Sequence, residues 1–221
     1  MHAMKFFSFW RSLASFRVRI ALNLKGIAAE VVSVDLLKGE QNKPEYHAVN
    51  PLMVIPALVD GDHPVLFESL AILEYLDEVH PKPPLLPNEP RARARVRGLA
   101  QIVACDAHPL IVPRVRNYLE RELKLDEPAR TKWVRHWFIE GFKALETHLA
   151  RDRETGRYCH GDSVTLADLC LVSHTVGGEF FDLDPADYPT CHRIAAACLK
   201  EDAFARAHPL RQPGAPKALK H

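Results

Sequence analysis

The first third of the chain alternates between strand-like and helix-like patterns of hydrophobic residues. Aromatic residues fill much of 5–10 and valines much of 29–36, and short apolar runs of this kind are typical of buried strands. Between them, Ser12 precedes apolar positions spaced for one face of a helix, and Gly26 is a residue type that commonly follows a helix end. The pattern therefore predicts a strand, a helix and a second strand.

A hairpin and another helix complete this part of the pattern. The apolar runs at 55–59 and 65–67 flank an Asp-Gly-Asp turn, and turn residues in that place favour a β-hairpin. Ser69 then opens a helical repeat of leucines, whereas the polar stretch at 38–43 predicts a loop. The expected order is β-α-β followed by β-β-α.

Prolines concentrate between residues 80 and 90, and the pattern beyond them is helical. A proline cluster is typical of a linker, so we expect an α/β domain over residues 4–84 and an all-α domain over 90–213. Within the second domain the pattern predicts a long helix at 91–108 bent near Pro109 and Pro113, an amphipathic helix through 133–149, a helix capped by Thr165 and Asp168, and helices at 190–199 and 202–207.

The charges of the chain nearly cancel. Its 221 residues include 29 Lys and Arg against 28 Asp and Glu, a net charge of +1. Nucleic-acid-binding proteins usually carry a basic excess, so we expect no nucleic-acid partner. No apolar run reaches the roughly 18 residues that span a bilayer, and the first residues lack the apolar core of a signal peptide. We therefore expect no membrane association and a cytoplasmic location.

The cysteines and histidines form neither a disulfide nor a metal pattern. The five cysteines are an odd number with no Cys-x-x-Cys spacing. We therefore expect the cysteines to be buried as small apolar side chains, in a protein of a reducing compartment. The 12 histidines show no metal-ligand spacing beside a carboxylate, so we expect no metal.

Three positions carry candidate chemistry, and each also suits an ordinary structural role. Pro56 follows Ile55 at a strand start, and a cis bond there would free the backbone N–H and C=O of Ile55 for a peptide-like ligand, although only about 5–6% of X–Pro bonds are cis. Ser69, at a helix N-terminus, suits an anion or a simple cap. Ser12 suits either a cap or contact with a ligand thiolate.

Four ordered motifs extend over nearly the whole chain. They are Phe9-Trp10-Arg11-Ser12 with residues 16–22, Asn50-Pro51 with residues 55–58, Phe67-Glu68-Ser69, and Gly161-Asp162 with residues 165–168. Together they resemble the zeta-class glutathione transferases, which include maleylacetoacetate and maleylpyruvate isomerases. The resemblance implies the glutathione transferase fold, with a thioredoxin-like N-terminal domain and an all-helical C-terminal domain, and usually a homodimer.

The resemblance also implies roles for individual residues, with glutathione as the cofactor. Ser12 matches the serine that hydrogen-bonds the glutathione sulfur. Gln41 falls where a loop side chain contacts the glycine end. Ile55, before cis-Pro56, matches the residue whose backbone pairs with the cysteinyl part, and Glu68 and Ser69 match the pair that holds the γ-glutamyl group.

The chain departs from the family pattern around the thiol and around the substrate. Leu13-Ala14 stands where the family has Ser-Cys, and Phe180 stands where it usually has an arginine that binds a substrate carboxylate. Arg11 is therefore our candidate for one carboxylate and Arg114 for the second. His108 keeps the family's His-Pro and suits either the substrate site or a helix bend.

These observations lead us to expect a glutathione-dependent cis–trans isomerase of a maleyl diacid, converting maleylacetoacetate to fumarylacetoacetate in aromatic amino acid catabolism. Ser12 and Arg11 are the expected catalytic residues. The alternatives are a maleylpyruvate isomerase, a transferase or dehalogenase for apolar electrophiles, which Phe180 would suit, and a non-catalytic glutathione-binding protein, because a fold does not determine a function.

Overall fold

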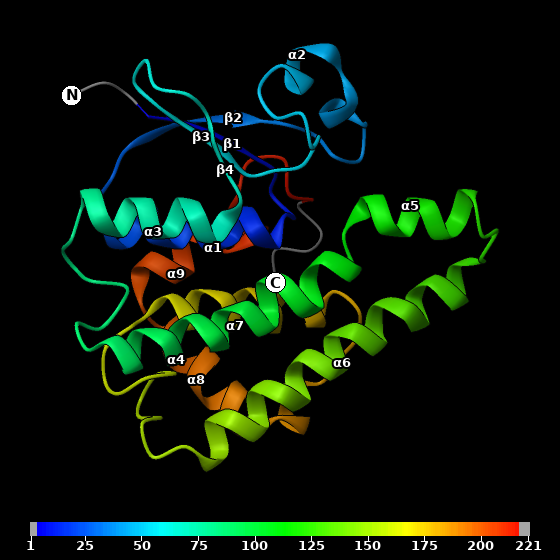
Figure 1. Ribbon diagram of the computed structural model, residues 1–221. Coiled ribbons are helices and arrows are strands. Elements are labelled where there is room, and N and C mark those ends of the chain that lie inside the picture. Colours follow the sequence, from blue (N-terminus) through cyan, green and yellow to red (C-terminus); the bar gives the residue numbers. More distant parts are fainter. Residues whose placement is uncertain (1–3, 217–221) are drawn as a thin grey trace. The chain divides into compact units, whose positions relative to one another are not determined.

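The computed structural model describes residues 4–216, which form two compact units (Figure 1). Among the described residues, the first unit comprises 4–85 together with 201–216, and the second spans Leu86–Lys200. The sequence pattern alone assigns residues 201–213 to the helical domain. In the structure, α9 (Asp202–Ala207) instead packs against α1 (Leu13–Leu24) of the first unit.

The first unit is built on a four-stranded sheet in the order β2-β1-β3-β4. Strand β1 (Met4–Ser8) pairs in parallel with β2 (Ala29–Ser33) and antiparallel with β3 (Ala57–Asp60), which pairs antiparallel with β4 (Leu66–Phe67). The expected β-α-β and β-β-α order is confirmed, with the hairpin where the turn residues place it.

Two of the strands are shorter than their apolar runs predict. The aromatic run continues to Trp10, but β1 ends at Ser8 because the backbone N–H of Ser12 donates to the carbonyl of Phe9 and closes a turn. The run at 29–36 leaves the sheet after Ser33. Side-chain hydrophobicity therefore extends beyond the strand in both places, since the turn residues are also buried or half-buried against the unit.

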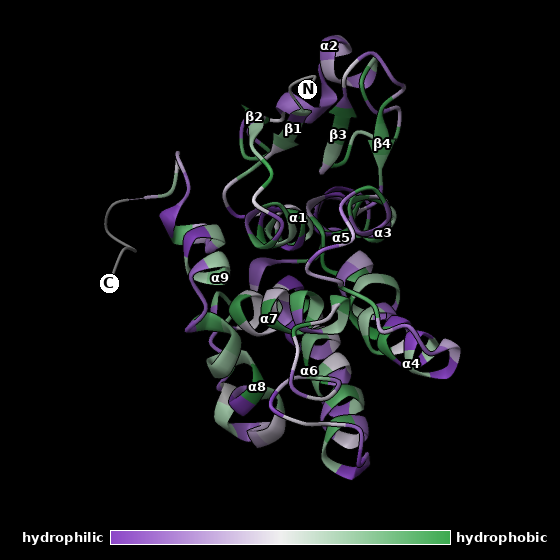
Figure 2. Ribbon diagram, turned by 90° about the vertical axis from the view of Figure 1, so that its left-hand side faces the viewer, coloured by the Kyte–Doolittle hydropathy of each residue, from purple (hydrophilic) through white to green (hydrophobic). Residues whose placement is uncertain are grey.

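Helices α1 and α3 (Ser69–Val79) lie side by side against one face of the sheet (Figure 2). Phe6, Phe16, Leu58, Ile72 and Leu73 have no exposed surface and form the core of this layer. Helix α1 ends as predicted, with Gly26 in the left-handed region at φ 64°. The polar stretch at 38–43 contains a 3-10 turn, η1 (Glu40–Asn42), followed by the short helix α2 (Pro44–His47).

The described part of the second unit is helical. The expected long helix at 91–108 is regular only in α4 (Pro90–Gln101), since a π-helical turn over Ile102–Ala107 and a 3-10 turn over His108–Leu110 complete the bend that the prolines predict. The remaining helices are α5 (Pro113–Arg121), α6 (Glu127–Arg151), α7 (Leu166–Glu179) and α8 (Pro189–Leu199), with a 3-10 turn at Pro185–Asp187.

Helix α7 is the buried centre of this unit, and all its residues except Glu179 are buried. Its start is the predicted capping box. The fully buried carboxylate of Asp168 accepts the backbone N–H groups of Thr165 at 2.7 Å and Cys159 at 2.8 Å, and also the hydroxyl of Thr165. Burial raises the pKa of Asp168, and these donors oppose the shift.

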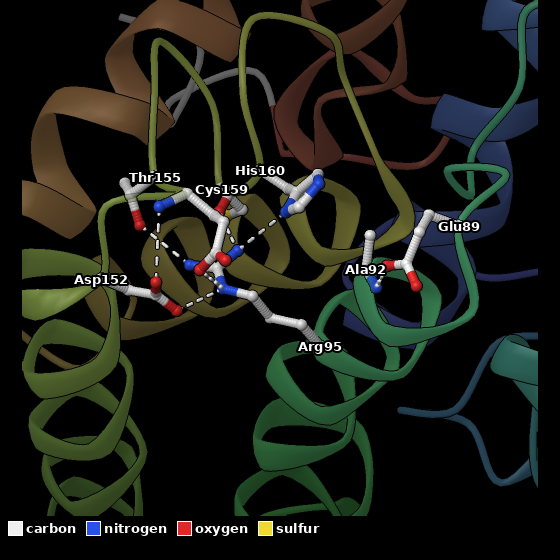
Figure 3. Close-up of polar contacts among 8 residues, drawn as sticks. Glu89, Ala92, Arg95, Asp152, Thr155, Cys159 and His160 are labelled. Carbon is white, nitrogen blue, oxygen red and sulfur yellow. Dashed lines mark hydrogen bonds and ion pairs between the residues drawn. The ribbon is translucent and has the colours of Figure 1, made fainter.

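A second polar cluster ties the N-terminal half of α4 to the loop that precedes α7 (Figure 3). The guanidinium of Arg95 donates to the Asp152 carboxylate, to the Cys159 carbonyl at 2.7 Å and to the Thr155 hydroxyl at 2.9 Å, and it lies 3.2 Å from Nδ1 of His160. This one side chain therefore holds several turns of an otherwise irregular loop in place.

Four of the five cysteines are buried as expected, whereas Cys105 is exposed, and none of the five, all of which lie within residues 4–216, is in a disulfide. Within residues 4–216, no helix is both long enough and apolar enough to cross a bilayer.

Candidate functional site

The predicted glutathione residues are carried by connections at one end of the sheet. Phe7 on β1 lies opposite Ala57 on β3, which lies opposite Phe67 on β4. The end of β1, the start of β3 and the end of β4 are therefore neighbours, and β2 ends on the same side because it runs parallel to β1. The connections at these strand ends carry Ser12, Gln41, Ile55, Glu68 and Ser69.

Ser12 is the N-cap of α1. Its Oγ accepts the backbone N–H of Ser15 at 3.1 Å. A serine hydroxyl also has one hydrogen to donate, and the residues described here offer Ser12 no acceptor for it. Capping and ligand contact are therefore compatible, because the cap uses the lone pairs of the oxygen and leaves its O–H for a ligand.

The Ile55–Pro56 peptide bond is cis, as the family resemblance implies and against the base rate for X–Pro bonds. Ile55 is buried and lies just outside β3, and within residues 4–216 its backbone N–H and C=O have no backbone partner. An extended peptide-like ligand is chemically suited to this pair of groups, since each offers one main-chain hydrogen bond.

Gln41 is buried in η1, and its Oε1 has no hydrogen-bond partner among the described residues. A buried polar atom without a partner is costly, and a ligand that carries an amide or ammonium donor removes that cost. This observation fits the glycine end of glutathione, whose amide and carboxylate are both polar.

Glu68 and Ser69 form the start of α3. Glu68 has φ 65° and ψ 121°, a backbone conformation that non-glycine residues rarely adopt and that concentrates at ligand sites. The adjacent Ser69 is buried, and its Oγ accepts a hydrogen bond from Nη1 of Arg17 at 3.2 Å. Arg17 was not among the residues predicted for the site, although a charged residue on the apolar face of a predicted helix is a signal that could have indicated it.

Arg11 lies directly before Ser12 and is half-buried. Burial lowers the pKa of its guanidinium below the ordinary arginine value. An arginine in a partly dehydrated setting binds a carboxylate more strongly than one in water, because the dielectric screening is weaker.

The predicted substrate residues of the second unit lie on or next to the bend between α4 and α5. His108 is half-buried in the 3-10 turn, and Arg114 is exposed in the first turn of α5. Phe180 is the half-buried C-cap of α7. The nearby Arg116 places its guanidinium 5.9 Å from the ring centre of Phe181 and is a cation that sequence reasoning missed.

No group of three His, Cys, Asp or Glu side chains within residues 4–216 is placed to hold a metal ion.

The fold and this site define a class of protein. Residues 2–78 match the family model described as glutathione S-transferase, N-terminal domain. The glutathione transferase fold implied by the sequence motifs is thereby confirmed, with its thioredoxin-like unit and its helical unit.

More specific relatives define the family. A maleylpyruvate isomerase of a Ralstonia species is 45% identical over 95% of this chain and 99% of its own length. The structure of a maleylacetoacetate isomerase from Methylobacterium extorquens AM1, with bound malonate and glutathione, matches with a TM-score of 0.95 at 57% identity, over 96% of this chain and 99% of that one. A holo maleylpyruvate isomerase described as a bacterial zeta-class enzyme matches with a TM-score of 0.92 at 44% identity, over 96% of this chain and 100% of that one. The chain belongs to this zeta-class glutathione transferase family of maleylacetoacetate and maleylpyruvate isomerases.

Proposed function

We propose that this protein is a glutathione-dependent cis–trans isomerase of a maleyl diacid, with maleylacetoacetate as substrate, fumarylacetoacetate as product and a place in aromatic amino acid catabolism. The observation that carries the proposal is the convergence of Ser12, Ile55 and Ser69 at one end of the sheet, in a chain 57% identical to a maleylacetoacetate isomerase. Each of the three offers a polar group suited to a different part of a peptide-like ligand.

Ser12 acts on the thiol. When bound, glutathione supplies a thiolate that adds reversibly to the carbon–carbon double bond, so that the bond can rotate before glutathione leaves unconsumed. Lowering a thiol pKa from about 8.5 to about 6.5 requires about 2.7 kcal/mol. A hydrogen bond to a charged group supplies about 1.5–3 kcal/mol, and a helix N-terminus about 0.3–1 kcal/mol. Ser12 at the start of α1 therefore suffices, although Ala14 stands where the family has cysteine.

Arg11 and Arg114 are the residues that we assign to the two substrate carboxylates, with His108 as a further substrate contact. Arg11 is half-buried beside the thiol-facing serine, and a guanidinium there forms charge-assisted hydrogen bonds that a neutral substrate does not make. The Methylobacterium structure contains malonate, a diacid, together with glutathione, which agrees with a diacid substrate for this protein.

Two observations favour other functions. The Ralstonia relative is a maleylpyruvate isomerase at 45% identity, so maleylpyruvate is the second candidate substrate. Phe180 in place of the family's arginine favours a transferase that conjugates glutathione to an apolar electrophile, because an aromatic side chain there offers a hydrophobic contact in place of a charge. A non-catalytic glutathione-binding protein would bind glutathione and turn over none of these compounds.

A side-by-side assay separates these functions. The purified protein is given glutathione with maleylacetoacetate, with maleylpyruvate and with an uncharged aromatic halide, and kcat/KM is measured for each. We expect maleylacetoacetate to be the best substrate, with glutathione unconsumed. Glutathione consumed in proportion to product would establish a transferase, and binding without turnover of any compound would establish the non-catalytic alternative.

We also propose a homodimer in the cytoplasm. Three of the exposed large apolar side chains of the first unit lie on its β3–β4 side: Leu52 and Met53 precede β3, and Phe67, which is 53% exposed, lies on the edge strand β4. A second copy of this chain is the occupant that covers them, since apolar groups clustered on an edge strand are otherwise an aggregation hazard. The cysteines are mostly buried and form no disulfide within residues 4–216, which supports a reducing compartment.

A further inference from the structure

Arg19 is a buried cation that has no role in the glutathione site as proposed above. It is 6% exposed and lies on α1, about two helical turns beyond the thiol-facing Ser12. Its acceptors among the described residues are neutral, and they are the hydroxyl of Ser8 at 3.1 Å and the carbonyls of Phe9 at 3.2 Å, Trp10 at 3.2 Å and Ala207 at 3.0 Å. A buried arginine normally pairs with a carboxylate, so a buried arginine whose hydrogen-bond acceptors are all neutral requires an explanation of its role.

The carbonyl of Phe9 connects Arg19 to Ser12 directly. It accepts the Nη1 donor of Arg19 and also the backbone N–H of Ser12 at 3.1 Å. The next carbonyl, that of Trp10, accepts Nη2 of the same guanidinium. Arg19 therefore holds two of the three peptide groups of the turn that leads from β1 to Ser12, and this turn sets the position of Ser12.

The fourth contact brings in the C-terminal segment. Nε of Arg19 donates to Ala207 at the end of α9, and Nδ2 of Asn23 donates to the Ala203 carbonyl at 2.9 Å, so α9 is fastened along α1. The centre of the His208 ring lies 6.0 Å from the centre of the Phe16 ring. The guanidinium of Arg19 is thus enclosed by residues that are far apart in the sequence. Burial lowers its pKa to about 9, so it remains charged at neutral pH.

We propose that Arg19 is a positioning residue of the glutathione site: it holds the Phe9–Trp10 turn against α9 so that Ser12 is aligned on the glutathione sulfur. The inference rests on the proposed function, because it assumes that Ser12 faces the thiol. A planar guanidinium with five donors matches this set of acceptors, whereas an ammonium presents three donors from a single atom. Lysine at this position keeps the charge and loses the geometry.

The test uses Arg19→Lys with three comparison variants. Ser12→Ala removes the proposed thiol donor, and Ser69→Ala removes a contact at the other end of the ligand. Arg95→Lys is the matched control, because Arg95 also holds a loop through several acceptors but lies in the second unit. Two quantities are measured for each variant: the pKa of the bound glutathione thiol, from thiolate absorbance in the ultraviolet, and the affinity for S-methylglutathione, which has no ionisable thiol.

We expect Arg19→Lys to behave like Ser12→Ala. The bound-thiol pKa should rise by about one unit, a tenfold smaller thiolate fraction below the pKa, while affinity for S-methylglutathione changes by less than about threefold. Ser69→Ala should weaken S-methylglutathione binding and leave the thiol pKa in place. Amide hydrogen exchange in the peptides over residues 9–12 and 203–208 should accelerate about tenfold in Arg19→Lys and remain unchanged in Arg95→Lys.

The outcomes distinguish this inference from the function on which it rests. If Ser12→Ala raises the thiol pKa and Arg19→Lys does not, Arg19 is merely structural and the inference is wrong, while the proposed function stands. If Ser12→Ala itself leaves the thiol pKa unchanged, the proposed role of Ser12 falls first, and the inference falls with it. Should Arg19→Lys fail to fold, Ser8→Ala removes one of the four acceptors, and a thiol pKa unmoved by that milder variant in a protein with a loosened 9–12 turn would overturn the inference.

Discussion

Ser12 has two bonding capacities that act on different partners. The oxygen caps α1 through the N–H of Ser15, and the O–H remains for a ligand. Deleting the hydroxyl therefore has two separable consequences, one for stability and one for the thiol. A structural serine and a catalytic serine differ only in the second.

Ser12→Ala should raise the pKa of bound glutathione by about one to two units, matching the roughly 1.5–3 kcal/mol of the lost hydrogen bond to a thiolate. The sign follows because the hydroxyl donates to the charged form and so favours ionisation. Titration of thiolate absorbance against pH in both proteins measures the shift. A variant that loses about 1 kcal/mol of stability with an unshifted curve would show that Ser12 is a cap alone.

Ser69→Ala should weaken glutathione binding by about 10-fold or more, since the lost contact is a hydrogen bond to the γ-glutamyl carboxylate, worth about 1.5–3 kcal/mol. Calorimetry measures the affinity, and circular dichroism checks that α3 is intact. Ser33→Ala, at an exposed serine of β2, is the matched control and should leave affinity unchanged. Unchanged affinity in Ser69→Ala would refute the assignment of the γ-glutamyl site.

Arg11→Met should reduce kcat/KM for a maleyl diacid by 10-fold or more, on the order of 1.5–3 kcal/mol, and should change conjugation of an uncharged electrophile far less. The reason is that only the diacid carries the carboxylate that we propose Arg11 binds. Arg151→Met, at an exposed arginine closing α6, controls for loss of positive charge. Equal losses for both substrates would mean that Arg11 is structural or serves glutathione instead.

At the scale of the elements, side chains that cap helix N-termini fix where several of the helices begin. Ser12 caps α1, Asp126 caps α6, and Thr165 with Asp168 begins α7. The box before α7 differs from the others because its carboxylate is fully buried and also accepts an N–H from outside the helix, that of Cys159. It therefore fixes the preceding loop as well as the helix.

Asp168→Ala should destabilise the protein by about 2–4 kcal/mol, because it removes a helix cap and leaves buried N–H groups of Thr165 and Cys159 without an acceptor. Asp162→Ala is the matched control: its carboxylate accepts one exposed N–H, that of Arg157, so we expect a loss below about 1 kcal/mol. Urea unfolding of both variants gives the comparison. Equal losses of unfolding free energy in the two variants would show that the buried cap of α7 contributes no more than the exposed contact of Asp162.

At the scale of the whole molecule, substitutions on the β3–β4 side of the first unit test the proposed homodimer. Met53→Glu and Phe67→Glu should convert a dimer to monomers, because each places a charge where apolar groups of two copies meet. Light scattering during size-exclusion chromatography measures the mass. Leu37→Glu, at another exposed apolar residue of the same unit, should leave the dimer intact. A wild-type monomer at micromolar concentration would overturn the proposal.

The order of elements was readable from the sequence because it depends on local patterns, and the residues proposed for the site stand in short local motifs. Apolar periodicity located the four strands and most helices within a few residues, and the capping spacing located the start of α7. The motifs around Ser12, Ile55 and Ser69 were each recognisable as short segments. Errors appeared where packing overrides periodicity, as at the early end of β1 and at the π-helical turn after Gln101.

The sequence by itself determined which residue types stand at the strand ends and helix starts, since turns, caps and periodic faces depend on neighbours a few positions away. Only the tertiary structure decided how those residues come together. The β1–β3–β4 register places Ser12, Ile55 and Ser69 at one end of the sheet, and α9 returns to α1, where Arg19 binds it. A pairing between residues 188 positions apart is determined by the packing of the whole unit, which no local pattern encodes.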